Sequence, residues 1–110
     1  MNQLPYLFRP IKIKSMEVKN RLVMAPMGTN LASQQGEATP SLISYYAARA
    51  RGGVGLIITD DTTVTSSAIY HPNGLRLHED CLVQSWKNLT QAVHAHGAKI
   101  APQLIHPSFN

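Results

Sequence analysis

Short apolar runs of strand length alternate with helix-periodic segments along this chain, and no other feature limits its fold as strongly. The runs lie at residues 22–25, 54–58 and 99–105, and the helical segments lie between them. Strands joined through helices run parallel, with right-handed crossovers. The pattern predicts an α/β fold with about three parallel strands and two helices.

The helix boundaries are marked by capping residues. Thr39 and Pro40 predict the start of the first helix, because a hydroxyl caps free amides and proline needs no amide proton there. We expect this helix to run to about Arg51. Its inner stripe is Leu42, Tyr46 and Ala50.

The second helix is expected to start near Asp80 and to end at Gly97. Its apolar stripe is Leu82, Trp86, Leu89 and Val93.

The remaining segments predict a hairpin, three strands and one long loop. Residues 7–25 indicate a small β-hairpin followed by a buried strand that Pro26 ends. The run at 54–58 is apolar throughout, which is typical of a strand covered on both faces. Residues 60–79 are expected to form a long polar loop, and loops of that length are often functional.

Composition excludes several classes. The chain has 110 residues, is 44% hydrophobic and carries a net charge of +4, which fits a single globular domain. Its basic residues are scattered, so nucleic-acid binding is not expected. The single Cys81 allows no internal disulfide, and His94 and His96 are too poorly spaced to share a metal. With neither a signal peptide nor a membrane-spanning run, a cytoplasmic protein is expected.

Length also suggests that the fold is incomplete. Each strand-helix unit takes roughly 40 residues, so eight units need about 300 or more, as in large (β/α)₈ barrels. The chain corresponds to the opening third of such a barrel.

Three segment groups carry a family resemblance when taken in order and spacing. They are LFRPI (7–11) with KNRLVMAPM (19–27), YYAARA (45–50) with GVGLII (53–58), and GAKIAPQLIH (97–106). Together they resemble the N-terminal part of the old yellow enzyme family, in its branch of NADH:flavin oxidoreductases, 2,4-dienoyl-CoA reductases and enoate reductases. The resemblance spans nearly the whole chain.

The resemblance implies a (β/α)₈ TIM barrel that holds non-covalent FMN at the carboxyl ends of its strands, with the hairpin plugging the other end. Residues 1–110 would then be the N-terminal fragment of an FMN-binding oxidoreductase domain. The family's catalytic and phosphate-binding groups come from later strands, so we expect them beyond residue 110.

The resemblance also assigns site residues. Those implied to bind the cofactor are Ala25, Pro26, Met27, Gly28, Asp61 and Gln103, and Asn30 is implied to contact substrate. Gln103 lies among apolar residues, and a buried amide needs the kind of partner that a flavin edge supplies. The alternatives are an ordinary strand end for 25–28 and a backbone-bonded amide for Gln103.

Asp60 and Asp61 allow several interpretations. Adjacent side chains of an extended strand point to opposite sides, so at most one carboxylate should face the barrel mouth. Family members mostly carry a small uncharged residue where Asp61 falls. Asp61 could disfavour an anionic reduced flavin, attract a cationic substrate or accept a proton, or else either residue could cap a solvated turn. His71 and His78 could flank a substrate, although loop histidines are more commonly solvated.

The implied function is hydride transfer from NADH or NADPH through FMN to an activated carbon–carbon double bond of a small-molecule substrate. One alternative is a flavin-dependent amine dehydrogenase or demethylase, which Asp61 favours. Another is a non-catalytic half-barrel that self-associates through open sheet edges, consistent with a homo-oligomer. The larger relatives add FAD and a 4Fe-4S cluster. No nucleic-acid or membrane partner is expected.

Overall fold

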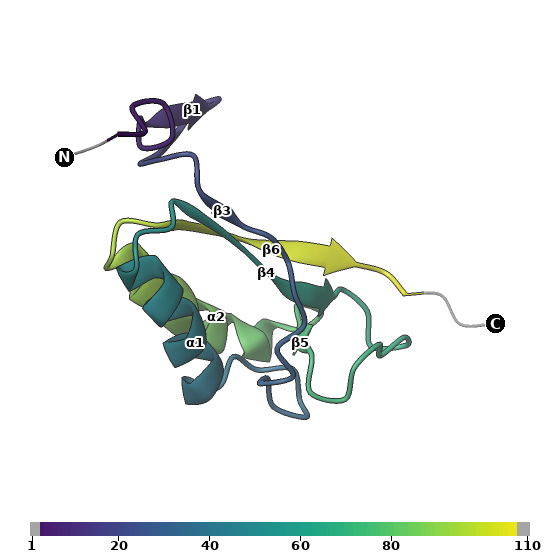
Figure 1. Ribbon diagram of the computed structural model, residues 1–110. Coiled ribbons are helices and arrows are strands. Elements are labelled where there is room, and N and C mark those ends of the chain that lie inside the picture. Colours follow the sequence, from purple (N-terminus) through teal and green to yellow (C-terminus); the bar gives the residue numbers. More distant parts are fainter. Residues whose placement is uncertain (1–2, 108–110) are drawn as a thin grey trace.

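A parallel sheet of four strands carries both helices on one of its faces (Figure 1). The computed structural model describes residues 3–107. The central strand β4 (Leu56–Thr63) pairs along its length with β6 (Lys99–Ile105). On its other side β4 pairs first with β3 (Val23–Met24) and then with β5 (Leu75–Arg76). The predicted α/β class and parallel strands are confirmed.

The first helix has the predicted boundaries. Helix α1 (Pro40–Arg51) is capped by Thr39, whose hydroxyl accepts a hydrogen bond from the Leu42 amide at 3.1 Å. The predicted stripe of α1 is buried. Gly53, with φ of +113°, lets the chain turn back toward the sheet.

The second helix is preceded by a short 3₁₀ turn, η1 (Asp80–Leu82), and then runs as α2 (Val83–His94). The four apolar residues predicted to face inward are all buried. They join the α1 stripe and Ile57 of β4 in one core between the helices and the sheet. The core therefore lies on a single face of the sheet.

The N-terminal hairpin lies at the amino ends of the sheet strands (Figure 1). Its strands are β1 (Ile11–Ile13) and β2 (Met16–Val18), which pair antiparallel as expected. The side chain of Asn20 ties the hairpin exit to the sheet, because it donates to the Gly53 carbonyl at 2.7 Å and accepts from the Leu22 amide at 3.0 Å. A Cβ at Gly55 would lie 2.4 Å from the Asn20 Oδ1, so glycine is required there.

Two predictions about strand burial are wrong. Strand β3 has two residues rather than four, and Val23 is 55% exposed. The run at 54–58 is covered on one face only, since Ile57 is buried while Leu56 and Ile58 are partly exposed. The physical reason is the same in both cases: alternate strand residues point away from the helices, toward a face that no described element covers.

The prediction of a loop over residues 60–79 is also wrong at the start of this range and near its end. Strand β4 continues through Asp60 and Asp61 to Thr63, and β5 occupies part of the remainder. The ladder with β6 shifts register between Ile58 and Asp61, where two residues of β4 oppose Pro102 alone. This is a β-bulge opposite a proline, which has no N–H to donate to the ladder.

Within residues 3–107, no helix is long and apolar enough to cross a membrane. No group of three or more His, Cys, Asp or Glu residues in this part of the chain is arranged to hold a metal ion. His94 ends α2 and is exposed, as is His96.

Candidate functional site

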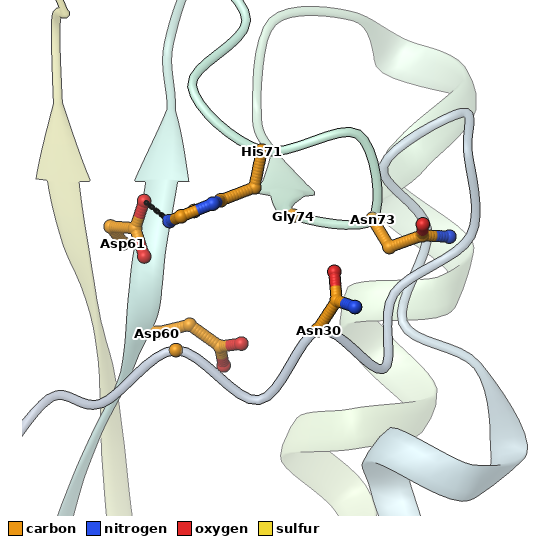
Figure 2. Close-up of a pocket in the computed structure, with 7 residues that line it drawn as sticks. Asn30, Asp60, Asp61, His71, Asn73 and Gly74 are labelled. Atoms are coloured by element: carbon orange, nitrogen blue, oxygen red, sulfur yellow. Dashed lines mark ion pairs between the residues drawn. The ribbon is translucent and has the colours of Figure 1, made fainter.

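A small cavity lies near the carboxyl ends of β3 and β4, beside the loop that leads into β5 (Figure 2). Its volume is about 110 Å³, enough for a few water molecules or a small part of a larger ligand. The lining residues are Gly28, Asn30, Asp60, Asp61, His71, Asn73 and Gly74. Polar side chains from three separate segments therefore converge here.

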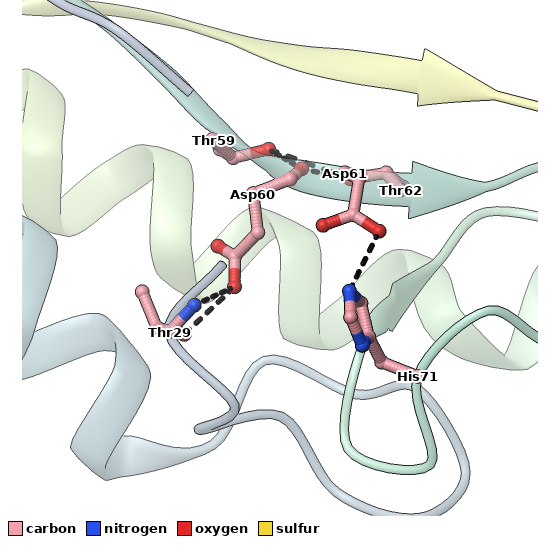
Figure 3. A network of polar contacts seen from close by, with 6 residues as sticks. All are labelled: Thr29, Thr59, Asp60, Asp61, Thr62 and His71. Atoms are coloured by element: carbon pink, nitrogen blue, oxygen red, sulfur yellow. Dashed lines mark hydrogen bonds and ion pairs between the residues drawn. The ribbon is translucent and has the colours of Figure 1, made fainter. Parts of the chain in front are cut away.

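Asp60 fastens the segment after β3 to the sheet through Thr29 (Figure 3), and it also binds α1 through Tyr46. Its Oδ2 accepts hydrogen bonds from the Thr29 amide at 2.9 Å and from the Thr29 hydroxyl at 2.7 Å. Its Oδ1 accepts a short hydrogen bond from the Tyr46 hydroxyl, which in turn accepts from the Asp60 amide at 2.8 Å. The side chain is 2% exposed, so these contacts take the place of water around a buried carboxylate.

The same network acts on Tyr46. Burial raises the pKa of the Tyr46 hydroxyl well above its ordinary value of 10, and the hydrogen bond to Asp60 and the charge of that carboxylate raise it further. Tyr46 therefore remains a hydrogen-bond donor throughout the neutral range. The expectation of a solvated turn cap is wrong for Asp60, because this residue is buried inside a strand.

Asp61 has a different environment. Its Oδ2 lies 3.4 Å from the Nε2 of His71, and its side chain is 17% exposed. The His71 ring also makes an edge contact with Tyr70, at 4.3 Å between centroids. Both carboxylates line one cavity, although strict alternation predicted that only one would face the mouth. The bulge at Thr59 and Asp60 is the reason, because it interrupts the alternation just before Asp61.

The residues expected to form a flavin bed occupy neighbouring strand ends. All four residues from Ala25 to Gly28 are exposed after β3, and Gln103 on β6 lies directly opposite Asp61 in the ladder. The expectation that Gln103 is buried is wrong: its side chain is exposed, because no described element covers that part of β6. Asn30 and Gly28 meet Asp61 in the cavity, whereas Gln103 and residues 25–27 lie outside its lining.

Two contributing residues, Tyr46 and Thr29, were not identified as site residues from the sequence. Tyr46 was assigned to the core stripe of a helix, and its hydroxyl was given no partner. Thr29 had no signal of its own, because its role depends on the position of Asp60 across the sheet. His71 was expected either to flank a substrate or to be solvated in the loop; its proximity to Asp61 arises from the path of the loop that leads into β5.

Comparison with known proteins decides the family. The sequence profile of the NADH:flavin oxidoreductase / NADH oxidase family matches residues 6–109. The chain belongs to this family. As a family member it has the fold of the N-terminal portion of a (β/α)₈ barrel, incomplete as a barrel.

Individual relatives agree with this assignment. An NADH oxidase from Thermoanaerobacter brockii is 43% identical over 112 aligned positions, which cover 96% of this chain and 16% of that protein. An NADPH dehydrogenase from Halalkalibacterium halodurans is 40% identical over 101 positions, covering 91% and 30%. The crystal structure of an Old Yellow Enzyme from Pichia sp. AKU4542 superposes with a TM-score of 0.83 and 37% identity, covering 92% and 26%. The chain thus spans less than a third of the length of these relatives.

The exposed strand ends fit the edge of a flavin. The Gln103 amide offers one donor group and one acceptor group, which is the chemistry that a flavin pyrimidine ring requires. In the described part of the chain, the backbone amides of Met27 and Gly28 have no hydrogen-bond partner. Gly28 also keeps the backbone accessible. Asp61 supplies acceptors only, so it fits an N–H group or a cation rather than a flavin carbonyl.

Proposed function

We propose that this chain contributes part of the FMN-binding face of an enzyme that transfers hydride from NADH or NADPH to an activated carbon–carbon double bond. The observation that carries the proposal is the placement of exposed hydrogen-bonding groups near the ends of the two parallel strands that flank β4, at residues 25–28 after β3 and at Gln103 on β6. Membership of a flavin oxidoreductase family supports it.

When bound, FMN supplies the hydride-transfer chemistry, and the protein supplies binding, orientation and electrostatics. Residues 25–28 would lie along the ring and donate backbone N–H groups. Gln103 would hold the polar ring edge. Asp60 fixes residues 25–28 in place. Thr29 directly follows that segment and donates hydrogen bonds to the Asp60 carboxylate. Asn30, in the cavity beside Gly28, would contact the substrate.

The proposal leaves the catalytic and phosphate-binding groups to parts of the protein beyond residue 110. A 4Fe-4S cluster needs four cysteine ligands, and this chain has one cysteine, so residues 1–110 supply no such site. Any FAD or iron–sulfur chemistry would belong to other regions. The exposed thiol of Cys81 fits a reducing, cytoplasmic environment.

Amine oxidation is the second candidate, and Asp61 is the residue that favours it. The structure places one oxygen of the Asp61 carboxylate against His71, so Oδ1 is the oxygen left for a cationic amine. Reduction of a double bond requires no charged partner on the substrate, and we therefore put it first.

The test uses the full-length protein that carries this chain. It should be purified and its flavin released by denaturation and identified. Without oxygen, the oxidation of NADH and NADPH should be followed in the presence of a simple enone, and the reduction of the bound flavin by an amine should be followed in a separate assay. We expect FMN, and nicotinamide oxidation that depends on the enone. A protein that binds no FMN, or that passes electrons only from amines, would contradict the proposal.

A further inference from the structure

Only one of the two adjacent carboxylates in the cavity is free to recognise a ligand. Both oxygens of Asp60 already accept hydrogen bonds, from Thr29 and Tyr46. Asp61 uses Oδ2 toward His71, while its Oδ1 has no hydrogen-bond partner among residues 3–107. Figure 2 shows the Asp61 carboxylate at the cavity wall, above Asp60 and across from Asn30.

Residue 28, which lines the cavity together with Asp61, is a glycine and places no side chain in front of Asp61 Oδ1. A Cβ at that position would lie 3.9 Å from the Oδ1, so a longer side chain would extend over the carboxylate. The acceptor therefore remains accessible to a ligand that enters between Gly28 and His71.

The cavity keeps a negative formal charge in either state of its histidine. Two carboxylates and one imidazole line it, and no Lys or Arg of the described residues does. The formal sum is −2 with His71 neutral and −1 with His71 protonated. In a site partly shielded from water, such a charge repels an anion and attracts a cation or an N–H donor.

We propose that Asp61, positioned by His71, makes this cavity select substrates that present an uncharged or cationic N–H donor and reject those that present a carboxylate at the same place. The inference rests on the proposed function, since it assigns a substrate class to the same site. It favours α,β-unsaturated amides over the matching α,β-unsaturated acids.

The experiment compares an unsaturated carboxylate with its primary amide on the same carbon skeleton. Dissociation constants are measured by calorimetry on the full-length protein at pH 7, and kcat/KM is measured for both compounds. We expect the wild type to favour the amide about tenfold or more, and Asp61→Asn to reduce this ratio about tenfold. Asp80→Asn, the same change at an exposed acid outside the cavity, should leave the ratio unaltered.

Two further variants keep the test decisive if Asp61→Asn does not fold. Asp61→Ala should reduce the ratio as Asp61→Asn does. His71→Gln should change it in the opposite direction, because the cavity then loses its only group able to carry positive charge. A ratio that stays within about twofold of the wild type in all three variants would overturn the proposal, as would the absence of binding by both compounds.

The two proposals fail separately. If the binding ratios shift as expected but neither compound is reduced, Asp61 still selects the ligand, and the proposed reaction is wrong. If both compounds are reduced but the Asp61 variants keep the amide-to-acid ratio of the wild type, the proposed reaction stands and the proposed selectivity is wrong.

Discussion

At the scale of single residues, two neighbouring aspartates have separate tasks. Asp60 is buried and fully hydrogen-bonded, and it holds the chain after β3 in place. Asp61 is partly exposed and faces the cavity beside His71. Sequence reasoning identified the pair as notable but could not divide the roles, because the bulge that orients the two carboxylates depends on pairing with β6.

Replacing Tyr46 by phenylalanine tests the Asp60 network. Removal of the hydroxyl leaves the Asp60 amide and Oδ1 without a partner in a buried position, and we expect the free energy of unfolding to fall by about 1–3 kcal/mol. Chemical denaturation of the full-length protein measures this. Tyr45→Phe is the matched control, because the Tyr45 hydroxyl makes no hydrogen bond within the described chain, and it should change stability by less than about 0.5 kcal/mol.

The raised pKa of Tyr46 adds a pH dependence. A group whose pKa is higher in the folded state stabilises the fold fully below its unfolded pKa of 10, and this stability is lost as pH rises above that value. We expect the free energy of unfolding to fall above pH 10 by up to about 1.4 kcal/mol per pH unit, and Tyr46→Phe to lack this contribution. Equal slopes in the two proteins would contradict it.

At the scale of elements, the helices and the first part of the central strand β4 were predictable, and the second half of that strand was not. Leu42, Tyr46 and Ala50 repeat at helical spacing and are flanked by a cap and a glycine pair, so pattern and boundary signals agree for α1. The boundaries of β6 were also predicted correctly. The second half of β4 is polar, yet Thr59, Asp60 and Thr62 are buried because the two threonine hydroxyls donate to the Asp60 carbonyl. The hydrophobic pattern of a sequence shows which segments are polar. It cannot show that polar groups are buried because they form hydrogen bonds with one another.

The cap of α1 has a second function that sharpens its test. The Thr39 hydroxyl accepts from the Leu42 amide and donates to the Leu31 carbonyl at 2.5 Å. Thr39→Ala should therefore lower the free energy of unfolding by about 0.5–2 kcal/mol. Thr39→Ser keeps the hydroxyl and should recover most of the loss; thermal or denaturant unfolding of both variants checks this. If the serine variant is as unstable as the alanine variant, the cap is not the cause.

At the scale of the whole molecule, one face of the sheet is covered by helices and the other face is exposed. The helices cover one side of the sheet, while strand residues such as Val23 and Leu104 stay 55% and 60% exposed. The hairpin lies at the amino ends of the strands (Figure 1), and the cavity is lined by residues near the carboxyl ends of β3 and β4. This polarity is that of a (β/α)₈ barrel, whose sites lie at the carboxyl ends of its strands.

The 110-residue chain by itself is expected to bind FMN weakly. It offers contacts to one edge of the ring, and the proposal places the phosphate-binding groups elsewhere. Equilibrium dialysis of the isolated chain should give a dissociation constant weaker than micromolar, with no nicotinamide oxidation. Micromolar or tighter binding to the monomeric chain would show that the phosphate site lies within these residues.

The central claim is that neighbouring strand ends of this chain hold the flavin, and Gln103 tests it most directly. The dissociation constant of FMN should be measured for the full-length protein and its Gln103→Ala variant, with Gln91→Ala on the exposed side of α2 as control. We predict binding about 5- to 150-fold weaker for Gln103→Ala, the equivalent of about 1–3 kcal/mol, and wild-type affinity for the control. An FMN affinity that Gln103→Ala leaves unchanged would contradict the account.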